Sequence, residues 1–184
     1  MRQARRTEHG TIRSLLTSAY WQFADTVPAP VFARYLDDLL DLDRHAEHGT
    51  IMVAESGGRI YGSGTFYPDA AVQGLGLPSG WAGGRGLAVR PQTRGLGIAR
   101  ALVEASRGMA RETGAPVFAF HSAVFMTAAR DLYTGLGFER APRYDVDLAE
   151  HYGFPELAPI PVLAFVDRTL STSARGDRRL EDVS

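Results

Sequence analysis

The 184-residue sequence contains no cysteine and no lysine, and each absence excludes a class of chemistry. Without cysteine there is no disulfide framework, no thiolate nucleophile and no cysteine-based zinc site, and nothing in the cysteine usage indicates secretion. All 20 basic residues are arginine. Schiff-base catalysis and a phosphate-loop lysine both require an ammonium side chain, so they are excluded as well. Any thiol in the chemistry has to come from a substrate.

The sequence also lacks a long apolar run and a strong net charge. Its formal charge is −1, from 20 basic and 21 acidic residues, so the overall field attracts neither nucleic acid nor an anionic membrane surface. The charged start "MRQARRTEHGTIRSLL" has no apolar signal core, and no uncharged stretch approaches the ~20 residues that a membrane-spanning helix needs. We therefore expect a cytoplasmic protein with no nucleic-acid partner and no membrane association.

What the sequence does have is a hydrophobic content of 45%, which is enough for one substantial core. We expect a single domain over residues 1–168. Residues 169–184, which end in "STSARGDRRLEDVS", form a polar tail that we expect to be disordered. We find no internal repeat.

Hydrophobic periodicity predicts an alternation of helices and strands. Two helices are predicted first, over 12–20 and within 27–49, and the second has an acidic far end. Two β-prone runs, 51–54 and 59–67, flank the glycine pair Gly57–Gly58 and predict an antiparallel hairpin. The remaining predictions are a loop at 70–80, strands at 81–91, 117–120 and 161–166, helices at 98–111 and 127–136, and irregular chain after Phe138.

Two glycines, Gly95 and Gly97, stand where the helix at 98–111 should begin. Glycine in a helix interior costs about 0.5–1 kcal/mol relative to alanine, so two at one helix start need a reason. The first amides of a helix lack partners and the helix dipole adds positive charge, so a bare backbone there suits a phosphate. Tight packing would also require glycine, and both explanations stay open at this point.

Two other phosphate-binding motifs do not match the sequence at this turn. The dinucleotide pattern G-x-G-x-x-G needs a third glycine where this sequence has Arg100, and the phosphate loop needs a lysine.

Two motifs together resemble the GNAT superfamily of N-acetyltransferases. The stretch "GLAVRPQTRGLGIARAL" resembles its Q/R-x-x-G-x-G/A acetyl-CoA motif, and "AARDLYTGLGF" resembles its later A-x-x-L-Y-x-x-x-G-F motif. The resemblance covers about residues 1–168, although "MRQAR" matches the family's opening strand poorly. It implies an α/β (α+β) fold with a mixed, mostly antiparallel central sheet, splayed between strands 4 and 5 and flanked by about four helices. Acetyl-CoA would lie in the gap.

By the same resemblance, the main chain of two segments holds acetyl-CoA. Leu87, Ala88 and Val89 would hydrogen-bond the pantetheine arm and the thioester. The pyrophosphate would lie against Arg94, Gly95, Leu96, Gly97, Ile98 and Ala99. Where the family often has an asparagine, seven residues before its tyrosine, this sequence has Met126, which removes one cofactor contact. No metal is required.

Tyr133 and His121 are the candidate catalytic residues. Attack by a neutral amine on the thioester expels a thiolate, and a phenol near the sulfur can donate the proton that it takes up. The motif assigns that role to Tyr133, which would otherwise be a core aromatic on an apolar helix face. His121 ends a predicted strand beside the gap and is the best-placed base, although a lone histidine there is often structural; Glu55 is a weaker alternative.

The acceptor side is the least patterned part of the sequence. The acidic run "DDLLDLDRHAEH" could attract a cationic amine, but such a run is more often a solvated helix face. Trp81, Tyr67 and Phe23 are candidates to line an acceptor pocket. His45 and His48 with Asp41 do not make a metal site without a second cluster of ligands.

We expect an N-acetyltransferase that moves an acetyl group directly from acetyl-CoA to a primary amine of a small molecule or a protein. The alternative is a non-catalytic acyl-CoA-binding regulatory module of the same fold, which Met126 favours and Tyr133 opposes. A third interpretation, a dinucleotide-binding protein, predicts NAD binding. Apolar helix faces allow a homodimer without indicating its interface.

Overall fold

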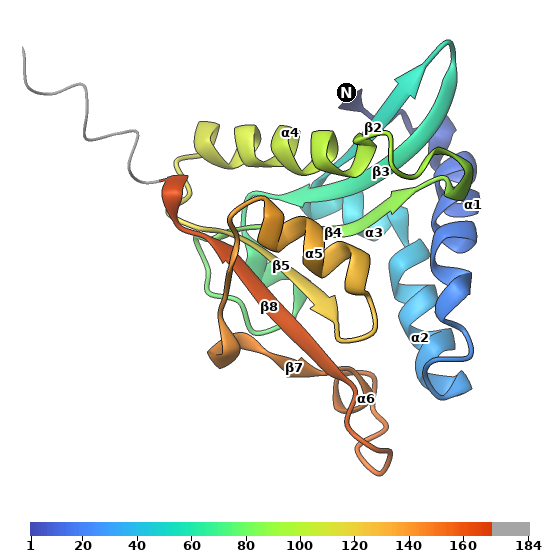
Figure 1. The fold of residues 1–184 in the computed structure, drawn as a ribbon, viewed down its shortest axis with the longest axis vertical. Coiled ribbons are helices and arrows are strands. Elements are labelled where there is room, and N and C mark those ends of the chain that lie inside the picture. The colour runs from blue at the N-terminus through green and yellow to red at the C-terminus, as the bar shows by residue number, and fades with distance from the viewer. Residues whose placement is uncertain (171–184) are drawn as a thin grey trace, which may run out of the picture.

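A mixed β-sheet runs through the middle of the fold, and helices cover both of its faces (Figure 1). The structure is a computed structural model that describes residues 1–170. Within this range the strand order is β1-β2-β3-β4-β5-β8-β6, with β7 paired to β8, and all pairs are antiparallel except β4 with β5. This confirms the expected mixed, mostly antiparallel sheet. The strands are β1 (Arg2–Gln3), β2 (Thr50–Ser56), β3 (Arg59–Tyr67), β4 (Ala82–Val89), β5 (Phe118–Ala123), β6 (Glu139–Arg140), β7 (Val146–Asp147) and β8 (Pro161–Asp167).

Six α-helices lie within residues 1–170, two more than expected. They are α1 (His9–Tyr20), α2 (Ala29–Leu40), α3 (Leu42–His48), α4 (Ile98–Glu112), α5 (Thr127–Gly135) and α6 (Leu148–His151). The single helix predicted within 27–49 is two helices, because Asp41 leaves the helical conformation and its carboxylate caps α3 by accepting from the Arg44 N–H. The segment predicted to be irregular after Phe138 contains the one-turn α6 and the two short strands β6 and β7.

The two middle strands pair at their beginnings and then separate. Ala82–Gly84 of β4 pair in parallel with Phe118–Phe120 of β5, after which β4 continues along β3 and β5 along β8. Glycine is required where they meet, because a Cβ at Gly84 would lie 2.1 Å from the Phe120 ring. The expected splay between strands 4 and 5 is confirmed, and Figure 1 shows the two arrows diverging.

A β-bulge follows the junction. Gly86 and Leu87 of β4 together stand opposite Gly64 of β3, between the pairs Thr65–Arg85 and Ser63–Ala88, and Gly86 has a φ of +65°. A bulge bends its strand and increases the local twist. This bulge therefore helps to turn the end of β4 away from β5.

Separate apolar clusters fill the two sides of the sheet. Helices α1, α2 and α3 pack on one cluster, which includes Leu15, Leu39 and Val53. Helices α4 and α5 pack on another, which includes Val103 and Phe118. Because the two groups of helices lie on opposite faces, the gap between β4 and β5 connects the two sides of the sheet.

The end of the expected domain extends slightly further than the sequence indicates. Leu170 is buried and packs in the cluster under α4 and α5, so the chain is still part of the core at this point. Residues 171–184, which make up most of the expected tail, lie outside the described residues. Within residues 1–170 no helix combines the length and the apolar character that crossing a bilayer requires.

Candidate active site

The gap between β4 and β5 opens into a cleft of about 570 Å³. This volume is in the range of small-molecule and cofactor sites. Both splayed strands line the cleft, together with the glycine turn before α4, the start of α5, and side chains from α1, α2 and the chain after α6. The same cleft therefore brings together segments that are up to 143 residues apart in the sequence, from Ala19 to Val162.

The glycine turn lies at one end of the cleft. Gly95 and Gly97 have φ angles of +82° and +77°, and Gly97 directly precedes the first residue of α4. Both angles lie in the left-handed region that favours glycine. A Cβ on either residue would meet no atom within 4 Å, so the explanation by tight packing is wrong. The turn combines an open space, the start of a 15-residue helix and the nearby side chains of Arg94 and Arg100, an arrangement that fits an anion.

The other residues predicted to hold acetyl-CoA lie along the same wall, with one exception. Leu87, Ala88, Val89, Ile98 and Ala99 all line the cleft. The side chain of Leu96 instead faces solvent, with 73% of the residue exposed. Main-chain contacts do not depend on where that side chain points, so its amide remains a candidate for the pyrophosphate.

Tyr133 lies on α5 and lines the cleft while being 3% exposed. Its ring stacks on Phe120 of β5, with 4.7 Å between the centroids and 10° between the planes. Burial raises the pKa of the Tyr133 phenol, so it keeps its proton at neutral pH. Tyr133 is thus both a core aromatic residue and a phenol that lines the cleft, although from the sequence alone these are alternatives.

His121 of β5 lines the cleft, and one of its ring nitrogens has no partner in the described part of the chain. Its Nε2 lies 2.8 Å from the carbonyl oxygen of Tyr144, which only accepts, so Nε2 carries the hydrogen. Nδ1 then has the lone pair, and it is buried with no hydrogen-bond partner among residues 1–170. Burial, and to a lesser degree the charge of Arg85, lower the pKa of His121, so the ring is neutral at neutral pH. A buried, neutral, unpartnered acceptor has the properties of a general base.

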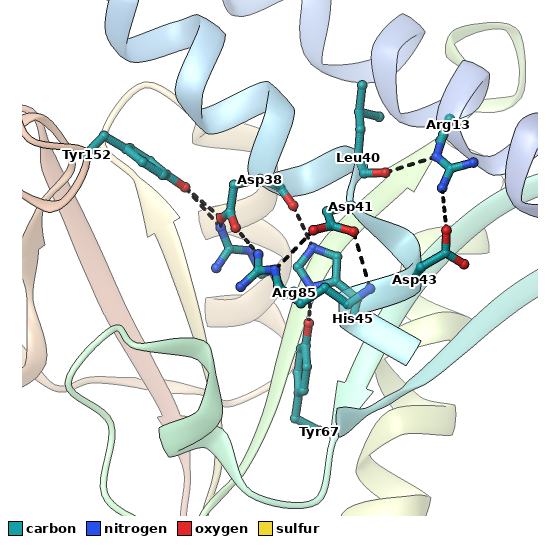
Figure 2. A network of polar contacts seen from close by, with 10 residues as sticks. Arg13, Asp38, Leu40, Asp41, Asp43, His45, Tyr67, Arg85 and Tyr152 are labelled. Atoms are coloured by element: carbon teal, nitrogen blue, oxygen red, sulfur yellow. Dashed lines mark hydrogen bonds and ion pairs between the residues drawn. The ribbon is translucent and has the colours of Figure 1, made fainter. Parts of the chain in front are cut away.

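A buried polar network that the sequence did not indicate borders the cleft (Figure 2). Arg85 of β4 donates to Asp38 of α2 and to the hydroxyl of Tyr152, which is 3.1 Å away, and that hydroxyl lies 2.8 Å from Asp38. Asp38 also pairs with Arg44. Burial alone would raise the pKa of Asp38, but Arg85, Tyr152 and Arg44 bring it below its ordinary value. The one available signal was an arginine within an otherwise apolar strand, "AGGRGLAV".

His45 and Tyr67 support this network from behind. The Nε2 of His45 lies 2.8 Å from the Asp38 carbonyl oxygen, and its Nδ1 lies 2.7 Å from the Tyr67 hydroxyl. Burial, assisted by Arg85 and Arg44, lowers the pKa of His45 to about 4. Both ring nitrogens are occupied, and no group of three potential metal ligands occurs in the described part of the chain.

Several other candidates lie away from the cleft. Glu55 accepts from the Gly58 amide at the hairpin turn and pairs with Arg2, so it is not placed to take a proton from an acceptor. Trp81 packs against Tyr144 and does not line the cleft, whereas Phe23 does. Among residues 1–170 no aspartate or glutamate lines the cleft, so the acidic run does not reach an acceptor there.

Comparison with known families agrees with this geometry. Residues 14–138, more than half of the chain, match the sequence profile of the acetyltransferase (GNAT) family. The chain belongs to the GNAT acetyltransferase family. The matched range contains β4, the glycine turn, α4, β5 and all of α5, which form much of the cleft. Members of this family are acyltransferases.

Individual GNAT relatives are distant. The mouse (Mus musculus) protein named "Probable N-acetyltransferase family 8 member 5" is 33% identical over 114 residues, which are 58% of this chain and 47% of that protein. The chain thus spans about half the length of the curated relatives it matches.

Solved structures agree with the GNAT fold. A putative GNAT acetyltransferase from Desulfovibrio desulfuricans superposes with a TM-score of 0.65 at 17% identity, over 91% of this chain and 96% of that one. A GNAT acetyltransferase from Brucella melitensis, solved in complex with acetyl-CoA, gives 0.55 at 23% identity, over 75% and 80%.

Proposed function

We propose that this GNAT protein transfers an acetyl group from acetyl-CoA directly to a primary amine. The observation that carries the proposal is that one cleft is lined by the open glycine turn, by the end of β4, and by both Tyr133 and His121. The donor is acetyl-CoA because the Brucella melitensis relative was solved with it and because the turn fits an anion. The amine acceptor is inferred from the chemistry below.

Main-chain groups make most of the proposed contacts to acetyl-CoA. The pyrophosphate lies against the amides from Arg94 to Ala99, where the dipole of α4 and the side chains of Arg94 and Arg100 favour negative charge. The pantetheine arm runs along Leu87 to Val89, the part of β4 that has left β5. The thioester then lies near the splay, between Tyr133 and His121.

The transfer is one addition and one elimination. The amine nitrogen attacks the thioester carbonyl carbon, and His121 Nδ1 takes the proton that the nitrogen loses, directly or through a water. The tetrahedral oxyanion collapses, the carbon–sulfur bond breaks, and the Tyr133 phenol protonates the leaving thiolate. The products are coenzyme A and an N-acetylated amine.

The replacement Tyr133→Phe tests this function against the non-catalytic alternative. Coenzyme A release is measured with acetyl-CoA and a panel of primary amines, and acetyl-CoA binding is measured in parallel by calorimetry. We expect turnover to fall about 10²–10⁴-fold, the usual contribution of a general acid, while binding changes little. If the wild type binds acetyl-CoA but releases no coenzyme A with any amine, the protein is the non-catalytic acyl-CoA-binding module instead.

A further inference from the structure

The charges that line the cleft are all of one sign. Its walls include Arg85, Arg94 and Arg100 and, within residues 1–170, no aspartate or glutamate. Arg94 and Arg100 lie at the glycine turn, where the donor's pyrophosphate is proposed to bind. Arg85 precedes the bulge of β4, on the side away from that turn. A cationic acceptor such as a polyamine would therefore meet no counter-charge in the cleft.

Arg85 is a largely buried cation that lines the cleft. Its side chain is 11% exposed and is held by Asp38 and by the Tyr152 hydroxyl (Figure 2). The same carboxylate also pairs with Arg44, which has a second carboxylate partner in Asp41.

Arg85 also has N–H groups beyond the ones that bind Asp38 and Tyr152. A guanidinium has five N–H groups, and both hydrogen bonds of Arg85 use Nη2. Its other nitrogens form no hydrogen bond within the described residues and are not among the fully buried polar atoms. These donors can bind a planar anion in the cleft.

The surroundings of Arg85 define the rest of the acceptor. His121, the proposed base, lines the same cleft as Arg85. The neighbouring walls are apolar and largely aromatic, with Phe23, Tyr35, Phe125, Leu148 and Val162. An acceptor that suits this site has an amine, an anionic group close to that amine, and an apolar body.

We infer that the acceptor is a free amino acid with an apolar side chain, whose carboxylate binds Arg85 while its amine lies on the side of the cleft that His121 lines. This inference rests on the proposed acetyltransferase function and specifies its substrate class. A polyamine lacks the carboxylate, and in a protein the carboxyl group next to the N-terminal amine is an uncharged amide. Both are therefore poor acceptors.

Matched acceptors test the inference. Phenylalanine, phenylalaninamide and phenethylamine share one apolar body and one amine but differ in the carboxylate, and leucine, leucinamide and 3-methylbutylamine form a second set. We expect kcat/KM for coenzyme A release to be about 10- to 100-fold higher for each amino acid than for its amide, the range for hydrogen bonds to charged groups. An amine next to an amide is less basic and is more often neutral, so inherent reactivity favours the opposite order.

Two variants link the preference to Arg85. Arg85→Gln should reduce kcat/KM for phenylalanine about 10- to 100-fold and leave phenylalaninamide nearly unchanged, because only the carboxylate loses its partner. The double variant Arg85→Gln with Asp38→Asn removes the buried carboxylate that Arg85→Gln alone would leave without this partner. It should show the same reduction of kcat/KM for phenylalanine. Retained acetyl-CoA binding would show that the double variant folds. Arg44→Gln is the control, because Arg44 pairs with Asp38 outside the cleft; it should keep the preference.

The outcomes separate the two proposals. If amides or simple amines are acetylated as well as the amino acids, the inference is wrong and the acetyltransferase function stands. If neither set is acetylated but other primary amines are, the inference is likewise wrong and the function stands. If no primary amine of the wider panel is acetylated, or if acetyl-CoA does not bind, both are overturned.

Discussion

At the scale of single residues, the glycines around the cleft are required for two different physical reasons. Gly84 has no room for a side chain, because Phe120 lies where its Cβ would be. Gly95 and Gly97 have room but need the left-handed backbone. The sequence alone does not distinguish a glycine that is required for lack of space from one that is required for its backbone conformation.

The replacement Gly84→Ala tests the first kind. The new methyl group would lie 2.1 Å from the Phe120 ring, which stacks on Tyr133. We expect a destabilisation of about 1–3 kcal/mol, typical of overpacking, and a loss of turnover because Tyr133 shifts with Phe120. Urea unfolding and coenzyme A release measure the two effects. Gly108→Ala on α4, where a Cβ meets nothing, is the control and should not be destabilising.

The role of His121 predicts a pH dependence. The neutral ring is the active form, and its pKa is lowered, so kcat at saturating acceptor should stay high below pH 6.5, the ordinary pKa of histidine, before it falls. His121→Gln should lower kcat about 10²-fold or more and remove this limb of the profile. His48→Gln, at an exposed position, should leave the profile as it is. A wild-type limb centred well above 6.5 would contradict the assignment.

At the scale of secondary-structure elements, one buried ion pair joins α4 to β8. Arg107 of α4 lies 2.7 Å from Asp167, which is 1% exposed, and also donates to the Leu136 carbonyl at the end of α5. Arg107 shares its helical spacing with Arg100, Glu104 and Arg111, and this spacing predicts a solvent-facing side chain. The helix instead presents this arginine to the core.

The replacement Arg107→Ala should leave Asp167 buried without its partner. We expect the free energy of unfolding to fall by about 3–5 kcal/mol, the usual cost of breaking a buried ion pair from one side. Arg111→Ala, one turn further on the exposed side of α4, should change it by less than about 0.5 kcal/mol. Equal, small effects of both replacements in chemical denaturation would show that the pair does not hold α4 on the sheet.

Most elements could be predicted because their signals are local. The hairpin of β2 and β3, the strand–turn–helix at 82–112 and the helix of Tyr133 all follow from apolar spacing and glycine positions. The break at Asp41 and the single turn of α6 were missed, because a cap and a one-turn helix leave almost no periodic pattern.

Sequence reasoning identified part of the cleft lining and missed the polar network beside it. Tyr133, His121 and most of the glycine turn line one cleft. Arg85, Asp38 and Tyr152 meet only in the folded chain, since Asp38 and Tyr152 are 114 residues apart. No local spacing could have revealed that contact.

At the scale of the whole molecule, the buried network predicts how stability depends on pH. His45 has a pKa of about 4 in the folded protein against an ordinary value of 6.5. Between these values the unfolded chain binds a proton that the folded protein does not, so stability is present above pH 6.5 and is lost as the pH falls toward 4. At 1.36 kcal/mol per pKa unit, the loss from this residue is about 3 kcal/mol.

Urea unfolding between pH 4 and 7 measures this loss. His45→Gln should flatten the dependence in that window, because the titrating group is gone, and should lower stability at pH 7 by removing the hydrogen bonds to Asp38 and Tyr67. His48→Gln should keep the wild-type slope. A His45 variant with an unchanged slope would place the source of the dependence elsewhere.

The proposed function requires that the glycine turn holds the pyrophosphate of acetyl-CoA. The most direct test is calorimetric titration of acetyl-CoA into the wild type and into Gly95→Glu. We predict that the wild type binds and that the variant does not, because a carboxylate there would fill the open space and repel the pyrophosphate. Gly58→Glu, at another left-handed glycine with open space around it, should bind like the wild type. No binding to the wild type, or equal binding to Gly95→Glu, would contradict the account.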